Sequence, residues 1–248
     1  MSKRKRTKKK NFKDKTQKQP LVGKTDKQER YIEALREKEL VVCTGPAGTG
    51  KTFVATTFAC DLYLAHKVNK LIFTRPNVPA GKSLGFFPGS LEDKLAPWVA
   101  PFTDILNKRL GKGALECGIK NGNIEFIPFE TMRGKTFDNA VIILDEAQNS
   151  TEEEMKMFLT RLGKNSLTII DGDITQNDLQ RTKSGLNMLT KILEDYTFDT
   201  TEVISFTFDD IVRSGLCKRF VRAFEGDLKK TNVRAHEELR ETYFLTNS

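Results

Sequence analysis

The 248-residue sequence contains no apolar run of 18 residues and has only four cysteines. A membrane-spanning helix needs about 20 mostly apolar residues, so no such helix is expected. The basic start is not followed by an apolar segment, which argues against a secretory signal peptide. The cysteines lie far apart without a CxxC pair. This pattern is unlike a disulfide framework or a zinc site and favours reduced thiols in a cytoplasmic protein.

Positive charge is concentrated at one end of the chain. Residues 1–27 hold twelve of the 41 Lys and Arg but two of the 33 Asp and Glu, which leaves 29 basic and 31 acidic side chains elsewhere. Such a segment buries too little apolar surface to fold alone. We therefore expect residues 1–25 to be a disordered basic arm. It either attracts the phosphates of RNA or single-stranded DNA or serves only as a solubilising tail.

Apolar runs and amphipathic segments alternate between residues 26 and 225. Several runs are continuous rather than alternating with polar residues, which is typical of strands covered on both faces. Helical patterns separate most of them. This order predicts an α/β fold, with a mostly parallel sheet between helices in a single domain. The expected strands are residues 39–44, 70–75, 124–129, 141–146, 166–173 and 202–206.

Two helix starts carry the spacing of a capping box. Ser150 and Glu153 have it ahead of one amphipathic segment, and Thr207 and Asp210 have it ahead of another. The second segment is expected to be one helix that holds Arg213 in its first turn.

The segment GPAGTGKT fits the pattern GxxxxGK[ST] and lies between an expected strand and an expected helix. Its glycines let backbone N–H groups turn toward phosphate oxygens, and the following helix adds its positive N-terminal end. Lys51 is expected to reach the β- and γ-phosphates of ATP, and the Thr52 hydroxyl to ligate Mg²⁺. The predicted loop contacts are Gly45, Pro46, Ala47, Gly48, Thr49, Gly50, Lys51 and Thr52.

A second motif, VIILDEAQNS, ends a strand with two carboxylates. Asp145 falls at the C-terminal tip, where parallel sheets bind ligands, and is expected to hold Mg²⁺. Glu146 is expected to act as general base toward the attacking water. The alternative, two ordinary acidic residues, is weaker because a phosphate loop lies upstream. In the next such segment, IIDGDITQND, Gln176 either senses the γ-phosphate or belongs to a polar turn.

Five segments together resemble the PhoH-like ATPase family: GPAGTGKT, TRP with SLGFFPG, ILDEAQN, GDITQNDL and DIVRSGL. They span roughly residues 26–225, and each alone would indicate only a P-loop ATPase. The family's lobe is similar to the first motor domain of superfamily-one helicases. The resemblance implies a RecA-like fold, ATPase activity and an RNA-related role.

The resemblance also implies roles for single residues. Gln28 matches the upstream glutamine that reads adenine in such helicases, and Tyr31 would stack on the base. The alternative for Gln28 is a solvated helix residue. Arg213 would be an arginine finger that neutralises transition-state charge, or else a surface cation paired with a nearby aspartate. Weaker candidates for the same task, or for nucleic-acid contact, are Arg75, Arg133 and Arg181.

Aromatic residues gather in residues 84–102, among them Phe86, Phe87 and Trp98. Aromatics beside basic residues can stack bases, but packing against the sheet is the expected role. Core positions are also expected for Met155, Met157 and Phe158.

A second motor lobe would need another α/β unit, and only the mostly polar residues 226–248 follow the expected domain. These residues are expected to be a docking helix or a loose tail. The active site would then be completed by identical subunits in a ring, such as a hexamer, or by another protein. Three functions stay open: ATP-driven work on RNA or single-stranded DNA, an ATP-controlled assembly switch, and a small-molecule kinase. The kinase is disfavoured because DEAQ with a downstream GD..Q suits water activation.

Overall fold

The computed structural model describes residues 19–76, 91–176 and 183–224. Its centre is a six-stranded sheet in the order β3-β2-β4-β5-β1-β6, with every pairing parallel. The six strands coincide with the six expected apolar runs, so the α/β prediction is confirmed. They are β1 Leu40–Thr44, β2 Lys70–Arg75, β3 Ile124–Pro128, β4 Ala140–Leu144, β5 Leu167–Gly172 and β6 Thr201–Ser205.

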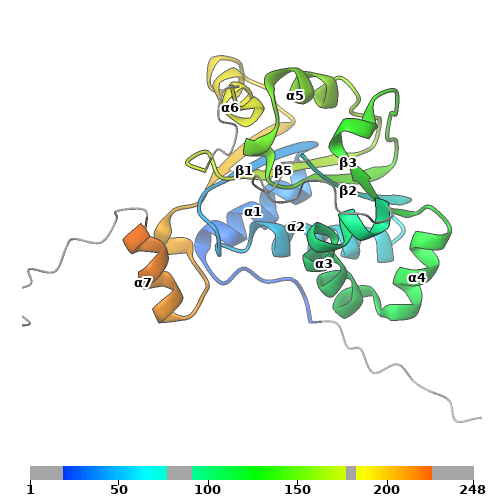
Figure 1. Cartoon of the computed structure of the whole chain (residues 1–248), viewed down its shortest axis with the longest axis horizontal. Helices are drawn as coiled ribbons and strands as arrows, with labels where there is room; N and C mark the ends of the chain where they lie inside the picture. The colour runs from blue at the N-terminus through cyan, green and yellow to red at the C-terminus, as the bar shows by residue number, and fades with distance from the viewer. Residues whose placement is uncertain (1–18, 77–90, 177–182, 225–248) are drawn as a thin grey trace, which may run out of the picture.

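Helices cover both faces of this sheet. In Figure 1, α1 to α4 lie on one face, α5 and α6 lie on the other, and α7 stands to one side. The helices are α1 Asp26–Glu37, α2 Lys51–Leu64, α3 Leu91–Leu110, α4 Lys112–Lys120, α5 Glu152–Leu159, α6 Gly185–Asp195 and α7 Gly215–Phe224. Three short 3₁₀ turns are η1 Phe129–Met132, η2 Ala147–Asn149 and η3 Phe208–Asp210.

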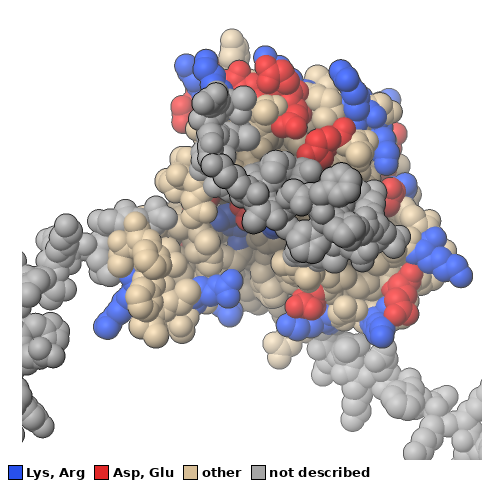
Figure 2. Space-filling view, viewed as in Figure 1, with Lys and Arg blue, Asp and Glu red and all other residues tan. Residues whose placement is uncertain are grey.

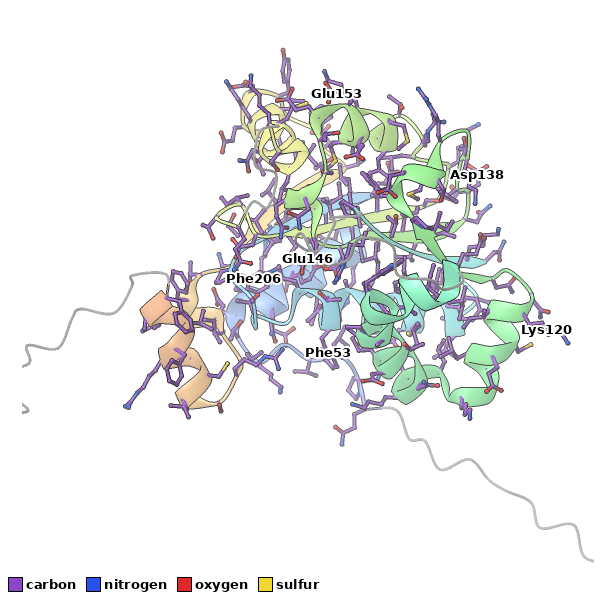
Figure 3. The ribbon with its side chains drawn as sticks, in the orientation of Figure 1. Phe53, Lys120, Asp138, Glu146, Glu153 and Phe206 are labelled. Atoms are coloured by element: carbon purple, nitrogen blue, oxygen red, sulfur yellow. The ribbon has the colours of Figure 1, made fainter. Side chains whose placement is uncertain are left out.

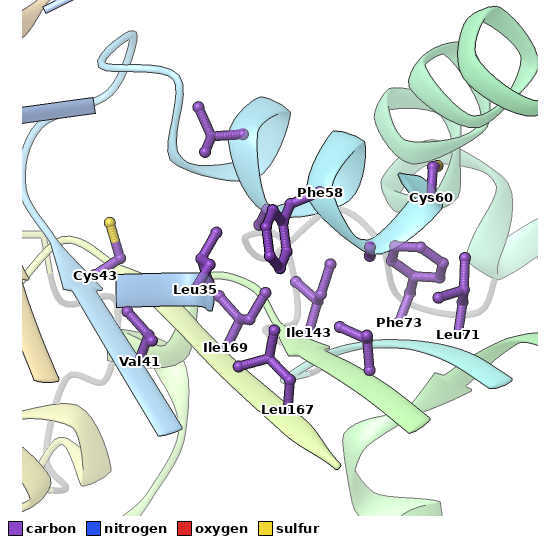
Figure 4. Close-up of a cluster of buried hydrophobic side chains, with 14 of the residues drawn as sticks. Leu35, Val41, Cys43, Phe58, Cys60, Leu71, Phe73, Ile143, Leu167 and Ile169 are labelled. Atoms are coloured by element: carbon purple, nitrogen blue, oxygen red, sulfur yellow. The ribbon is translucent and has the colours of Figure 1, made fainter. Parts of the chain in front are cut away.

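Successive residues of a strand point to opposite faces, and the two cores follow this period. In β4, Ile143 belongs to the core under α1 to α4, which Figure 4 shows in part. Ile142 and Leu144 belong to the core under α5 and α6. Each fully buried side chain of this size stabilises the fold by about 1.5–3 kcal/mol relative to exposure. The predicted core positions Met155 and Phe158 are buried, and Met157 is half-buried.

Strand β5 lies between β1 and β4. The strand before the phosphate loop and the strand before the acidic pair are therefore not neighbours. Because all the strands are parallel, their C-terminal ends still meet at one edge of the sheet, where ligands bind in open α/β folds.

Two helix predictions were wrong in detail. The capping box of α5 is formed by Thr151 and Glu154, one residue later than expected, because the Ser150 hydroxyl is buried and donates to the Ala147 carbonyl at 2.7 Å. Thr207 caps only η3, so α7 starts at Gly215 and Arg213 precedes it. The segment between η3 and α7 is bound to the phosphate loop, and this attachment interrupts the expected helix.

The predicted boundary of the basic arm was also wrong for residues 19–25. Leu21 packs against the core beneath α1 to α4, and the Gln19 carbonyl accepts a hydrogen bond from Arg109 at 2.6 Å. Thr25 is the N-cap of α1 and accepts from the Gln28 amide. The ordered domain therefore includes at least these seven residues.

The aromatic segment is only partly described. Trp98 is half-buried and packs edge-on against Phe102 and Phe126, which fits the expected packing role. Phe86 and Phe87 lie outside the described residues, as does the segment 226–248. Among the helices of the described residues, none combines the length and apolar character needed to cross a membrane.

Candidate active site

The phosphate loop connects β1 to α2, and its glycines are required by geometry. Gly45, Gly48 and Gly50 have φ of 134°, 86° and 86°, values that favour glycine. A Cβ at Gly48 would lie 2.9 Å from the Arg213 Cγ, and one at Gly50 would lie 2.7 Å from the Gln28 Nε2. The missing side chains therefore let two predicted site residues approach the loop backbone.

The polar side chains of the loop are held by short hydrogen bonds. The Lys51 Nζ donates to the carbonyls of Gly45 at 2.6 Å and Pro46 at 3.1 Å, so it reaches back across the loop. Thr49 is buried and its hydroxyl also donates to the Pro46 carbonyl. The Thr52 hydroxyl donates to the Asp145 Oδ1 at 3.2 Å. Loop and acidic pair thus meet directly, although 93 positions separate these two residues.

Asp145 and Glu146 follow β4 and have different surroundings. The Asp145 carboxylate is 7% exposed and forms an ion pair with Arg75. Glu146 is 44% exposed and has a φ of 53°, which is uncommon for a residue other than glycine. Its Oε2 accepts a hydrogen bond from the Gln148 Nε2 at 2.6 Å. Figure 3 shows Glu146 near the centre of the molecule with Phe53 of α2 below it.

Gln148 connects the acidic pair to the end of β5. While its Nε2 holds Glu146, its Oε1 accepts from the Asp173 amide at 3.0 Å. Gln148 is not among the site residues predicted from the sequence. The sequence signal for this role was a glutamine two positions after the acidic pair. A glutamine amide can donate a hydrogen bond through its nitrogen and accept one through its oxygen.

These elements enclose a cleft of about 530 Å³ at the C-terminal edge of the sheet. Most predicted site residues line it, whereas Tyr31, Gly45, Pro46 and Thr49 do not. Gln176 is exposed at the cleft. The predicted residues in its wall are Gln28, Ala47, Gly48, Gly50, Lys51, Thr52, Asp145, Glu146, Gln176 and Arg213.

Arg213 reaches this cleft from the segment between η3 and α7. The Val212 amide donates to the Gly48 carbonyl at 3.0 Å, which fixes that segment against the loop. Arg213 itself is exposed and lies against Gly48. It therefore faces the phosphate loop of its own chain.

The end of the cleft beside α1 differs from the prediction. Gln28 is 3% exposed; its Oε1 accepts from the Lys24 amide and its Nε2 donates to the Thr49 carbonyl, both at 2.7 Å. The prediction that Tyr31 stacks on a base is wrong in this structure, because its ring is fully buried, edge-on to Phe206.

Two apolar side chains that sequence analysis missed line that end of the cleft instead. Phe53 is 51% exposed and Val22 is 63% exposed. Phe53 directly follows Thr52 in the sequence, and its exposure could not be recognised from helical periodicity.

A neutral carboxyl lies beneath the loop. The Tyr31 hydroxyl donates to the Asp171 Oδ1 at 3.1 Å, and both residues are fully buried. Burial, reinforced by the negative charge of Asp145, raises the pKa of Asp171 to about 8. Burial likewise raises the pKa of Tyr31 and of Cys43. At neutral pH Asp171 therefore mostly keeps its proton.

The donors at Thr52 and Asp145 fit a Mg²⁺ ion. Both are oxygen atoms, the ligand type that Mg²⁺ prefers, and Mg²⁺ is usually held by one or two protein groups together with phosphates and water. The described residues contain no cluster of three or more His, Cys, Asp or Glu suited to a metal.

The three weaker arginine candidates differ in their position relative to the cleft. Arg75 is brought to the cleft, where it pairs with Asp145. Arg133 is exposed just after η1 and does not line the cleft. Arg181 lies outside the described residues.

Comparison with known proteins gives consistent matches. The family model described as PhoH-like protein matches residues 20–225. Protein PhoH of Escherichia coli K12 is 42% identical over 209 residues, which cover 83% of this chain and 58% of that protein. PhoH-like proteins of Synechocystis and Bacillus subtilis are 42% and 43% identical, covering 82% of this chain and 62% and 63% of theirs.

The matched region spans about three fifths of the length of these relatives. Among solved structures, the Pif1 helicase of Candida albicans aligns over 75% of this chain and 40% of its own at 14% identity. Its TM-score of 0.37 is too low to support a comparison of sites. On the family match and the identity to its relatives, the chain belongs to the PhoH-like protein family.

Proposed function

We propose that this protein binds ATP with Mg²⁺ and hydrolyses it. The observation that carries the proposal is the single cleft that unites the phosphate loop with the acidic pair, joined by the hydrogen bond between Thr52 and Asp145. A phosphate loop binds nucleotide, a strand-end aspartate beside its threonine suits a divalent cation, and a partly exposed carboxylate next to it suits water activation.

Each side chain would have a distinct task. Lys51 and the loop amides would bind the β- and γ-phosphates of ATP. Thr52 and Asp145 would hold Mg²⁺, which would neutralise negative charge on the phosphate oxygens. Glu146 accepts the proton of the water as its oxygen bonds to the γ-phosphorus and the bond to the β–γ bridging oxygen breaks. Gln148 orients Glu146 for this step through its 2.6 Å hydrogen bond.

Two further residues would act on the transferred phosphoryl group. Gln176 lies on the cleft wall and would contact the water or a γ-phosphate oxygen. Arg213 would neutralise developing charge on the same group. Because Arg213 lies against Gly48 of its own loop, we assign it to the ATP bound by the same chain rather than to a neighbour's ATP.

The adenine would bind at the end of the cleft that holds Gln28 and Phe53. The exposed ring of Phe53 supplies an apolar surface for the base, in place of the buried Tyr31. The Gln28 amide already bonds to two backbone groups, but its remaining donor and acceptor capacity can still serve an adenine edge.

We further propose that hydrolysis is coupled to RNA or single-stranded nucleic acid, within a ring of identical subunits. The basic residues 1–27 support the nucleic-acid part because phosphate backbones attract such segments. A second candidate is an ATP-controlled assembly switch for a protein partner, which the exposed apolar face of α7 favours. Turnover that rises with added RNA or single-stranded DNA would favour the first candidate.

The test of the ATPase is the substitution Lys51→Ala. It should abolish phosphate release and weaken ATP binding, because the ammonium group at the mouth of the loop is removed. Lys112→Ala is a matched control, since Lys112 is 83% exposed on α4 and remote from the cleft. Phosphate release is measured with Mg²⁺ present, and nucleotide binding by a fluorescent ATP analogue. Equal turnover of Lys51→Ala and the unmodified chain would disprove the site.

A further inference from the structure

Helix α7 carries an apolar stripe that nothing in the described structure covers. Leu216, Phe220 and Phe224 follow one another at four-residue spacing and are 67%, 55% and 82% exposed. None of the ten residues of the helix is buried. On the face shown in Figure 2, the surface of α7 is mostly uncharged with Lys and Arg at its edges.

The opposite side of this helix makes polar contacts with the domain. The Lys218 Nζ donates to the Asp209 carbonyl at 3.0 Å, and Arg222 forms an ion pair with the Asp209 carboxylate. Such exposed contacts contribute little to stability. A helix shorter than about 12 residues is marginal in water without tertiary packing. The stripe of α7 therefore needs a partner surface.

An apolar groove of about 350 Å³ lies at the other end of the sheet. It is bounded by α5, α6 and the first residues of β1, β5 and β6, and its exposed apolar side chains include Leu162 and Phe198. Its lining does not include any residue proposed for the active site.

Charge around the groove complements the helix. Glu39 lines the groove and is exposed, and Glu194 and Asp195 are exposed at the end of α6, next to the lining residue Leu193. Arg219 is exposed on α7, three residues after Leu216. Lys164 and Lys191 are also exposed next to lining residues, so the match is partial. Charges at such a rim select the orientation of a partner more than they add affinity.

The helix cannot reach the groove of its own chain. The segment before α7 is bound to Gly48, beyond the C-terminal end of β1, whereas the groove is lined by Leu40 at the start of β1. A five-residue strand, roughly 17 Å long, separates the two. A second copy of the chain does not have this restriction.

We propose that the α7 stripe of one copy docks in the α5–α6 groove of the next copy. This is the binding of an amphipathic helix in an apolar groove. The two surfaces differ, so the contact is heterologous and builds a ring or a filament rather than a closed two-fold pair. Because α7 begins two residues after Arg213, docking would also restrain the arginine at the nucleotide cleft.

The test measures the mass of the full chain by sedimentation velocity over a range of concentrations. Phe220→Glu alters the helix, and Phe198→Glu alters the groove at a side chain that is 49% exposed. The unmodified chain should form assemblies larger than the 28.1 kDa single chain. Each variant should sediment as a single chain. Ile119→Glu is the control, because Ile119 is 45% exposed on α4 and belongs to neither surface, and it should assemble normally.

An equal mixture of the two variants gives a second, stricter result. The Phe220→Glu copy keeps an intact groove and the Phe198→Glu copy keeps an intact helix, so one of each should form a pair. The helix and groove left over in that pair both carry a substitution, so the pair should not grow further. Cooperative thermal unfolding of each variant establishes that it is folded.

The proposal is overturned if the unmodified chain stays single at every concentration, as it would if residues 225–248 filled its own groove. It is equally overturned if either variant assembles like the unmodified chain or if the mixture forms no pair. ATP turnover is measured on the same samples. Hydrolysis without assembly would reject this interface alone, and assembly without hydrolysis would reject the ATPase alone.

Discussion

Glu146 combines backbone strain with a proposed chemical role. A left-handed conformation of a residue other than glycine costs on the order of 1–3 kcal/mol and persists only where its surroundings enforce it. Here β4 ends immediately before Asp145, and Gln148 fixes the Glu146 carboxylate from the other side. The strained turn directs Glu146 into the cleft while Asp145 stays buried beside Thr52.

Arg213 allows a test of whether one chain contains a complete hydrolytic site. Arg213→Ala should lower turnover at least about 100-fold while ATP binding is largely kept, because its charge matters most in the transition state. The informative measurement mixes Arg213→Ala with Glu146→Gln copies. An arginine that serves its own chain predicts no recovery of activity in the mixture. Recovery toward a quarter of normal turnover would show that it serves a neighbour.

Asp171 predicts a pH dependence of stability. Its pKa is about 8 in the folded protein and near its ordinary value when unfolded. Between these two values the folded state holds a proton that the unfolded chain has released, so the free energy of unfolding falls as pH rises. The slope is at most on the order of 1.4 kcal/mol per pH unit.

Asp171→Asn should remove that decline, because the amide imitates the protonated acid. Urea unfolding from pH 4 to pH 8 measures it. Asp195→Asn, at the exposed end of α6, should leave the decline in place. Parallel curves for Asp171→Asn and the unmodified chain would show that Asp171 is charged in the folded state.

At the scale of helices and strands, the sequence predicted what depends on local pattern. All six strands were identified because strands buried on both faces form continuous apolar runs. The phosphate loop and the acidic pair were identified because each motif lies within ten residues. The burial of Tyr31 depends on Asp171, 140 positions away, and the place of Arg213 depends on Gly48. Such contacts have no local signal, so the expected exposure of the Tyr31 ring and the expected helical position of Arg213 were wrong.

The start of α5 shows how small the deciding differences are. Ser150 and Thr151 both precede a suitable glutamate, and only the buried hydrogen bond from Ser150 to Ala147 selects the later cap. Thr151→Ala should therefore lower the free energy of unfolding by about 1 kcal/mol. Thermal unfolding followed by circular dichroism measures the change. Thr160→Ala, at the exposed other end of the helix, should stay within about 0.5 kcal/mol of the unmodified chain. If both substitutions lowered the free energy of unfolding by the same amount, the Thr151 cap would have no special role in stability.

At the scale of the whole molecule, the positive charge and the proposed catalytic groups are carried by different parts. Residues 1–18 hold ten Lys and Arg with one Asp, whereas residues 28–248 are slightly acidic overall. The domain therefore has little net attraction for a polyanion. If the protein binds nucleic acid, the basic residues should supply much of the affinity, and that share should depend on salt.

Deletion of residues 1–18 tests this separation and leaves Val22 and Lys24 of the cleft in place. Affinity for single-stranded RNA and DNA, measured by fluorescence anisotropy at several salt concentrations, should fall. In a plot of the logarithm of the association constant against the logarithm of the salt concentration, the slope should become shallower. It should change by about 0.7 for each phosphate that the shortened protein no longer neutralises. A variant of unchanged length, with Gln at the ten basic positions, should behave like the deletion if charge is the cause. ATP turnover without nucleic acid should be unaffected in both. Unchanged affinity and slope would leave the segment as a solubilising tail and require a nucleic-acid surface on the folded domain itself.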